Sequence, residues 1–317
     1  MIIQIFMLIL GFILLIKGAD IFIDGASSTA QNFKVSKILI GLTIVAFGTS
    51  APELAISFKA LSNGSADMVL GNVIGSNITN GLLILGVASI IRNITLKQNT
   101  VKKELPLHML ISTILVVLFL DKPINNMSVN MISRSDAITI LLVFSVFLYY
   151  IISISRNKID EDEELGKYST PKSLLLIVLG LLGIFIGSNL VVENASLIAK
   201  TLGISERVIS LTIIALGTSL PEIVTTIVSS LKKEQDILVG NIIGSNLFNI
   251  CIVLGLPVSI YGSIIPSSFQ IIDLAILIIM SILIYIIPKF NNYKITRIDG
   301  LVLIIIYFIY YISVFIF

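Results

Sequence analysis

Two carboxylates stand within apolar stretches of the chain, each in the same six-residue context. Glu53 ends the motif Gly48-Thr-Ser-Ala-Pro-Glu53, and Glu222 ends Gly217-Thr-Ser-Leu-Pro-Glu222. A charged group near a bilayer centre costs at least about 2.5–3.5 kcal/mol on insertion scales, so it normally faces a cavity or a partner. The proline before each glutamate breaks a helix. We interpret these motifs as a ligand site; the alternative is a pair of structural carboxylates, protonated and hydrogen-bonded between helices.

Both motifs belong to a longer internal repeat. A second block, Gly71-Asn-Val-Ile-Gly-Ser-Asn-Ile-Thr-Asn80, returns as Gly240-Asn-Ile-Ile-Gly-Ser-Asn-Leu-Phe-Asn249. The two copies of each block are 169 positions apart, and no gap separates them. The same offset pairs Gly18 with Gly187. Two carboxylates that meet at a pseudo-two-fold axis would form a strong site for a divalent cation.

Oxygen donors accompany the carboxylates in both copies. Hydroxyls come from Thr49, Ser50, Thr218 and Ser219; polar stripes at every fourth residue come from Asn72, Ser76 and Asn80 and from Asn241, Ser245 and Asn249. The prolines free backbone carbonyls near Ala46, Phe47, Ala215 and Leu216. Oxygen ligands without thiol or imidazole suit Ca²⁺, Na⁺ or Mg²⁺ rather than Zn²⁺ or Cu, and Mg²⁺ is disfavoured because it retains water. For the stripes, hydrogen bonding between helices is the alternative.

The composition places these motifs in a membrane protein. Hydrophobic residues make up 56% of the chain and charged residues 13%, whereas a soluble domain carries about 25% charged residues. A bilayer core needs roughly 20 apolar residues per helix. Ten such runs are present: 2–24, 37–60, 68–91, 105–121, 136–155, 173–194, 207–230, 237–260, 268–288 and 299–317. We therefore expect an all-α integral membrane protein of ten transmembrane helices.

The odd number of spans per copy predicts inverted repeats. Five spans fill residues 1–155 and five fill 173–317, so the second copy enters the membrane from the opposite face, with the interrupted helices at the centre. Sixteen of the 21 basic residues lie in one set of connections, which predicts external N- and C-termini and a cytoplasmic linker at 156–172. The acidic run 160–164 lacks the spacing of a calcium loop, which favours a solvated linker over a regulatory calcium sensor.

The lone cysteine, the lone histidine, the net charge and the absence of enzyme motifs narrow the possible classes of protein and site. The lone Cys251 excludes an intramolecular disulfide and a cysteine-built metal site. The lone His108, which follows Pro106 at the start of an apolar run, is expected at the membrane interface. A net charge of +2 gives no support for nucleic-acid binding. The chain has no His-Glu-x-x-His or Gly-x-Ser-x-Gly motif, so an intramembrane enzyme is disfavoured.

At the repeated blocks the chain resembles the calcium/cation antiporter family, specifically its prokaryotic sodium/calcium exchangers. The two copies look like that family's alpha repeats, over about 18–90 and 187–259. The resemblance implies that Glu53 and Glu222 bind Ca²⁺. It also implies that the Na⁺ and Ca²⁺ sites are lined by Thr49, Ser50, Ser76, Asn80, Thr218, Ser219, Ser245 and Asn249, with the carbonyls of Ala46 and Ala215. Potassium-dependent relatives carry Asp at the position of Asn249, so this residue argues against K⁺ coupling and removes a third carboxylate of some prokaryotic relatives.

The resemblance implies a secondary antiporter of the cell membrane, not an enzyme. It would exchange Na⁺ for Ca²⁺ by alternating access at one shared central site. Its partners would be these ions and the bilayer, without a cofactor, and we expect it to function as a monomer. Exchange of Ca²⁺ for H⁺, or of another divalent cation, is the alternative. A cation channel with a carboxylate ring is a further class, disfavoured because channels place the pore on an oligomer axis.

Overall fold

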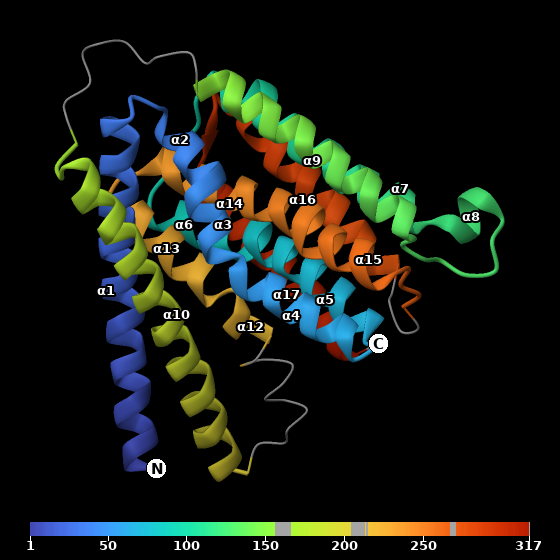
Figure 1. Ribbon diagram of the computed structural model, residues 1–317, viewed down its shortest axis with the longest axis horizontal. Coiled ribbons are helices and arrows are strands. Elements are labelled where there is room, and N and C mark those ends of the chain that lie inside the picture. The colour runs from blue at the N-terminus through green and yellow to red at the C-terminus, as the bar shows by residue number, and fades with distance from the viewer. Residues whose placement is uncertain (156–165, 204–212, 214, 267–270, 317) are drawn as a thin grey trace. The chain divides into compact units, whose positions relative to one another are not determined.

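The computed structural model describes residues 1–155, 166–203, 213, 215–266 and 271–316, and these residues are almost entirely helical (Figure 1). Within these residues, seven helices are long and apolar enough to cross a bilayer. The bent pair Lys37–Thr49 and Ala51–Ser62 brings the count to eight if it forms one span. The predicted class, a helical integral membrane protein, is confirmed. Ten spans and inverted repeats remain predictions.

Several predicted boundaries can be compared with the helices. The first span, expected over 2–24, continues as a helix to Asn32, and the fourth, expected over 105–121, is the helix Leu105–Phe119. Four predicted segments fall partly outside the described residues. These are residues 156–165 of the linker 156–172 with its acidic run, the first part of the span 207–230, the start of the span 268–288, and the last residue of the span 299–317.

The chain forms two compact units that draw on both halves of the sequence. Unit 1 takes residues 1–49 and 158–241, and unit 2 takes 50–157 and 242–317. This division by contacts in space leaves the predicted division by repeats untested. Unit 1 contains α1 (Ile2–Asn32), α2 (Lys37–Ile40), the π-helix η1 (Gly41–Val45), α3 (Ala46–Thr49), α10 (Thr170–Thr201), α12 (Ala215–Thr218), α13 (Leu220–Leu231) and the first part of α14 (Gln235–Phe248).

Helices α1 and α10 lie next to each other in unit 1 and run antiparallel (Figure 1). Their backbones approach so closely that glycine is required at the crossing. A Cβ atom at Gly18 would lie 2.7 Å from the backbone nitrogen of Ile184, and one at Gly187 would lie 2.5 Å from that of Leu15. The sequence repeat already pairs Gly18 with Gly187. Both copies therefore supply a glycine to the same helix pair.

Buried side chains of α1 form the centre of the core of unit 1. Phe22 and Ile23 are fully buried and belong to one cluster with Ile184 of α10 and Val228 of α13. A charged cluster, made of Asp20, Asp24, Lys167 and Lys232, lies at the surface of the same unit. The Lys232 Nζ atom is 2.8 Å from Asp20 Oδ1 and also pairs with Asp24. These contacts connect α1 with the end of α13.

Unit 2 holds the remaining helices. They are α4 (Ala51–Ser62), α5 (Ala66–Ile78), the π-helix η2 (Thr79–Ile84), α6 (Leu85–Ile91), the π-helix η3 (Thr100–Glu104), α7 (Leu105–Phe119), α8 (Asp121–Asn125), α9 (Arg134–Ser155), the end of α14, the π-helix η5 (Asn249–Leu254), α15 (Gly255–Tyr261), α16 (Ile271–Phe290) and α17 (Arg297–Ile316). Strands β1 (Ile94–Thr95) and β2 (Lys294–Ile295) pair antiparallel. An isolated bridge joins Ile132 to Ile264.

Candidate functional site

Both Gly-Thr-Ser-x-Pro-Glu motifs interrupt a helix, as predicted. Helix α3 ends at Thr49 and α4 begins at Ala51, with a bend of 44°. The residue between them, Ser50, has φ −88° and ψ 7°, and Ser219 between α12 and α13 has φ −87° and ψ 4°. These values lie in the sparsely populated bridge region, where active-site residues are often found. The two copies therefore break the helix in the same way.

Each glutamate lies in the first turn of the helix that restarts after the break. Proline is tolerated there because the first turn leaves its backbone nitrogens without an intrahelical acceptor. Glu53 is fully buried and Glu222 is 3% exposed. The positive end of the helix dipole favours a negative charge at this position. Although Ser-x-x-Glu is the sequence of a capping box, neither Ser50 nor Ser219 caps its helix with its side chain.

Most of the predicted ligands are buried in the units to which they belong. Unit 1 carries Ala46, Thr49, Ala215, Thr218, Ser219 and Glu222, and unit 2 carries Ser50, Glu53, Ser76, Asn80, Ser245 and Asn249. Ten of these twelve side chains are buried, and Thr218 is half-buried. For Ala215 only the backbone is described, as part of α12. Their roles as ligands remain predictions.

Asn241 of α14 forms hydrogen bonds with both α3 and α13 in unit 1. Its Oδ1 atom accepts a hydrogen bond from the Thr49 hydroxyl of α3 at 3.2 Å. Its Nδ2 atom donates to the hydroxyls of Thr225 and Thr226 on α13, at 3.3 and 3.2 Å. In the same unit, the Ser188 hydroxyl of α10 donates to the carbonyl oxygen of Gly217 at 3.2 Å. For Asn241, hydrogen bonding between helices is therefore observed.

Asn72 has a comparable position in unit 2 but fewer partners. Its Nδ2 atom donates to the backbone oxygen of Glu53 at 3.0 Å and to the Ser57 hydroxyl at 3.2 Å. These bonds join α5 to α4, immediately at the buried carboxylate. Asn72 thus contacts the backbone of Glu53, the residue that carries the carboxylate. For Asn72, too, hydrogen bonding between helices is observed.

Four asparagines form crossed hydrogen bonds in unit 2. Asn80 Nδ2 donates to Asn246 Oδ1 at 3.0 Å, and Asn249 Nδ2 donates to Asn77 Oδ1 at 3.1 Å. Asn77 Nδ2 donates to the backbone oxygen of Asn246 at 3.2 Å. All four side chains are buried. The Oδ1 atoms of Asn80 and Asn249 are also buried and have no hydrogen-bond partner among the described residues.

The expectation that His108 is an interfacial side chain is wrong. Its ring is 1% exposed, and Nε2 lies 3.1 Å from Asn246 Nδ2. Asn246 is the hydrogen-bond partner of Nε2, whereas Nδ1 is buried without a partner among the described residues. Nothing in the sequence around His108 signals this contact.

Sequence reasoning also missed Asn77 and Asn246. Both stand in the repeated Gly-Ser-Asn segment, so their matched positions were a usable signal. They fall outside the stripe that recurs at every fourth residue, which directed attention to Ser76, Asn80 and their equivalents. The π-helices η2 and η5 were not expected either. These π-helices contain Asn80 and Asn249, and such segments occur frequently at functional sites.

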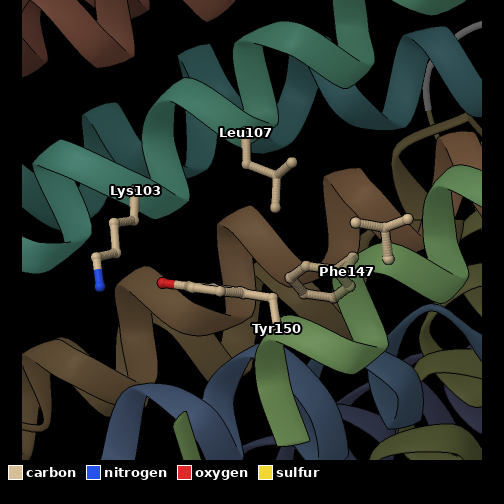
Figure 2. A pocket seen from close by; sticks show the side chains of 5 residues that line it. Lys103, Leu107, Phe147 and Tyr150 are labelled. Atoms are coloured by element: carbon tan, nitrogen blue, oxygen red, sulfur yellow. The ribbon is translucent and has the colours of Figure 1, made fainter. Parts of the chain in front are cut away.

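A groove of about 250 Å³ lies in unit 2 between the α7 and α9 regions (Figure 2). Leu107, Val146 and Phe147 give it apolar walls, and Lys103 and Tyr150 are its only polar lining residues. The Tyr150 hydroxyl points toward the side of the groove where Lys103 lies and donates a hydrogen bond to Glu104. No predicted ligand lines this groove, so it is separate from the candidate ion site.

Comparison with known proteins assigns the family. The family model for the sodium/calcium exchanger protein matches residues 3–153 and 172–316. The inner membrane protein YrbG of Escherichia coli (strain K12) is 36% identical over 87% of this chain and 86% of its own length. The sodium/calcium exchanger MaX1 of Methanosarcina acetivorans is 30% identical, with 95% of each chain covered.

A solved structure agrees with this assignment. The sodium-calcium exchanger NCX_Mj, soaked with 10 mM Na⁺ and no Ca²⁺, matches with a TM-score of 0.85 and 32% identity, over 97% of both chains. The helical architecture and the sequence match therefore point to the same family. The chain belongs to the sodium/calcium exchanger protein family, and it is a multi-pass membrane protein that carries out cation antiport.

Proposed function

We propose that the protein exchanges Na⁺ for Ca²⁺ across the cell membrane at one shared site. The observation that carries this proposal is the pair of helix breaks at Ser50 and Ser219. Each break is followed within one turn by a buried glutamate, Glu53 or Glu222. Two carboxylates at helix N-termini in a membrane protein require a cation or another compensating partner.

The remaining predicted ligands supply neutral oxygens around the carboxylates. Ca²⁺ takes six to eight oxygen ligands in flexible geometry, and interrupted helices supply both side-chain and carbonyl oxygens. We assign this role to Ala46, Thr49, Ser50, Ser76, Asn80, Ala215, Thr218, Ser219, Ser245 and Asn249, besides the two glutamates. The unpartnered oxygens of Asn80 and Asn249 support the assignment, because buried acceptors are normally satisfied.

Exclusive occupancy would couple the two ions. The two carboxylates would neutralise one Ca²⁺ or bind several Na⁺, but they would not bind Ca²⁺ and the Na⁺ ions at the same time. The site would open alternately to each side as the antiparallel pair of α1 and α10 slides or rocks. The protein would require no cofactor and would function as a monomer.

The proposed topology has ten spans in two inverted repeats, with N- and C-termini outside and the 156–172 linker in the cytoplasm. The basic residues favour this orientation. Two carboxylate–tyrosine hydrogen bonds in unit 2 support the repeat relation. Glu104 of η3 accepts from Tyr150 of α9, and Asp273 of α16 accepts from Tyr310 of α17. Glu104 and Asp273 are 169 positions apart, the same offset as the repeated motifs.

Flux into vesicles tests the exchange. Purified protein in proteoliposomes loaded with Na⁺ should take up ⁴⁵Ca²⁺ well above liposomes loaded with K⁺. Uptake driven by an acidic interior but not by Na⁺ would replace this proposal with exchange of Ca²⁺ for H⁺. Uptake without any counter-ion gradient would indicate a channel.

A further inference from the structure

The crossed hydrogen bonds of unit 2 fix the orientation of two buried amides. Asn80 and Asn249 are equivalent residues of the two copies, and each uses its Nδ2 atom to bind an asparagine of the other copy. An amide side chain has one donor end and one acceptor end. With Nδ2 held by a partner, the Oδ1 atom points elsewhere. In both residues this oxygen is buried and has no hydrogen-bond partner in the described part of the chain.

The asparagines that accept these bonds are themselves oriented. Asn77 is held because its Nδ2 atom donates to the backbone oxygen of Asn246. Asn246 is held because its Nδ2 atom lies 3.1 Å from His108 Nε2. Since Asn246 Oδ1 already accepts from Asn80, its Nδ2 is the end left to donate, and His108 Nε2 is the acceptor.

The hydrogen bonds from Asn80 to His108 all run in one direction. Asn80 donates to Asn246, and Asn246 donates to His108. Removal of the imidazole acceptor leaves Asn246 free to turn its amide over. Its Nδ2 atom would then face Asn80 Nδ2, and Asn80 would have to turn and present N–H groups where its oxygen now lies. A cation binds the oxygen end of an amide and is repelled by the N–H end.

We propose that Asn77, Asn246 and His108 are positioning residues that hold the Oδ1 atoms of Asn80 and Asn249 toward a bound Ca²⁺. The inference rests on the proposed function, because it takes Asn80 and Asn249 as ligands. His108 acts on one copy only. The residue 169 positions later is Leu277, so the other ligand depends on Asn77 and a backbone carbonyl.

Equilibrium binding of ⁴⁵Ca²⁺ to the purified protein tests this role without requiring transport. His108→Leu and Asn246→Leu should each weaken Ca²⁺ binding by about 10- to 100-fold, the usual effect of losing a residue that orients a metal ligand. His108→Gln should bind Ca²⁺ like the wild type, because its amide oxygen can accept from Asn246. The variant that combines His108→Leu with Asn246→Leu should bind Ca²⁺ no more weakly than Asn246→Leu alone, since both residues act through one chain of hydrogen bonds.

Ser112→Ala is the matched control. Ser112 is buried one helical turn from His108 on α7, and the change should leave Ca²⁺ binding unaltered. Protection of the buried Cys251 thiol from a reactive dye reports that each variant is folded. Should the leucine variants fail this check, His108→Asn replaces them, because its shorter amide cannot reach Asn246 and it should weaken binding similarly.

The outcomes separate the two proposals. Wild-type protein that binds no Ca²⁺ would overturn the proposed function together with this inference. Normal Ca²⁺ binding by folded His108→Leu, His108→Asn or Asn246→Leu protein would overturn the positioning role alone. Equal losses in His108→Gln and His108→Leu, or multiplied losses in the double variant, would also overturn it and assign His108 to packing.

Discussion

The two copies of the repeat have matching ligand residues but different hydrogen bonds around them. Asn241 makes three side-chain hydrogen bonds and is 1% exposed, whereas its equivalent Asn72 makes two and is half-buried. One of the differences comes from a residue outside the repeated blocks. Thr225 offers Asn241 a hydroxyl, whereas Ile56, at the corresponding position of the first copy, offers none. A residue that was not duplicated therefore supplies one of the bonds in which the two copies differ.

The same comparison applies around the asparagine cluster. Asn246 contacts an imidazole, and Asn77 contacts a backbone carbonyl. The helix break, the buried glutamate and the unpartnered amide oxygen recur in both copies. The two copies should therefore respond alike when a ligand is changed and differently when a supporting residue is changed.

The largest effect is expected at the glutamates, where the copies should agree. Glu53→Gln or Glu222→Gln should each weaken Ca²⁺ transport at least about 100-fold. Breaking a buried charge pairing costs about 3–5 kcal/mol, and about 1.4 kcal/mol is tenfold in affinity. The measurement is ⁴⁵Ca²⁺ uptake at graded Ca²⁺ concentrations. Glu193→Gln, an equal charge change at an exposed position of α10, should have little effect. Normal transport by either glutamine variant would leave that glutamate with a structural role.

The next effect is expected at the supporting asparagines, where the copies should differ. Asn241→Leu should lower the free energy of unfolding by about 3 kcal/mol, and Asn72→Leu by about 1 kcal/mol, because the first leaves more buried polar groups unsatisfied. Thermal unfolding can be followed with a thiol-reactive dye, since Cys251 is fully buried in the folded protein. Equal losses in the two variants would show that burial and bond number do not distinguish the copies.

A comparable but smaller loss is expected at the crossing of α1 and α10. Gly18→Val and Gly187→Val should each cost about 1–3 kcal/mol of unfolding free energy, because the new side chain forces the two backbones apart. The two values should be similar, since both positions lie in the same helix pair. Ile9→Val on the exposed face of α1 is the control and should be nearly neutral. A large difference between the two valine variants would contradict the equivalence of the glycines.

The smallest effect is expected in the charged cluster, which joins the two copies and is not reproduced at the equivalent positions. The positions that correspond to Asp20 and Lys232 are Asn189 and Asn63. Lys232→Gln should cost about 0.2–1 kcal/mol, because Asp20 and Asp24 are partly exposed to solvent. The loss should shrink as salt is added and screens the pair. Thermal unfolding at low and high NaCl measures it, and a loss that does not depend on salt would assign Lys232 to packing.

Most of the elements that surround the site were predictable from local patterns. Proline and glutamate in apolar sequence identified both helix breaks, because a local steric effect sets their position. The offset of 169 residues identified Gly18 and Gly187 as equivalent. The partners of Asn241 and the burial of His108 were not predictable, since they depend on residues far apart in the sequence.

The sequence by itself determined the membrane class, the repeat, the two interrupted helices and the set of oxygen-bearing residues. These follow from hydropathy, proline geometry and self-similarity, which act within a few residues or are visible by direct comparison. Only the tertiary structure decided that Asn246 meets His108 and that Asn80 and Asn249 bind across the copies. The physical reason is that the hydrogen-bonding neighbours of an amide side chain set its orientation, and those neighbours come from segments about 140 to 170 residues away in the sequence.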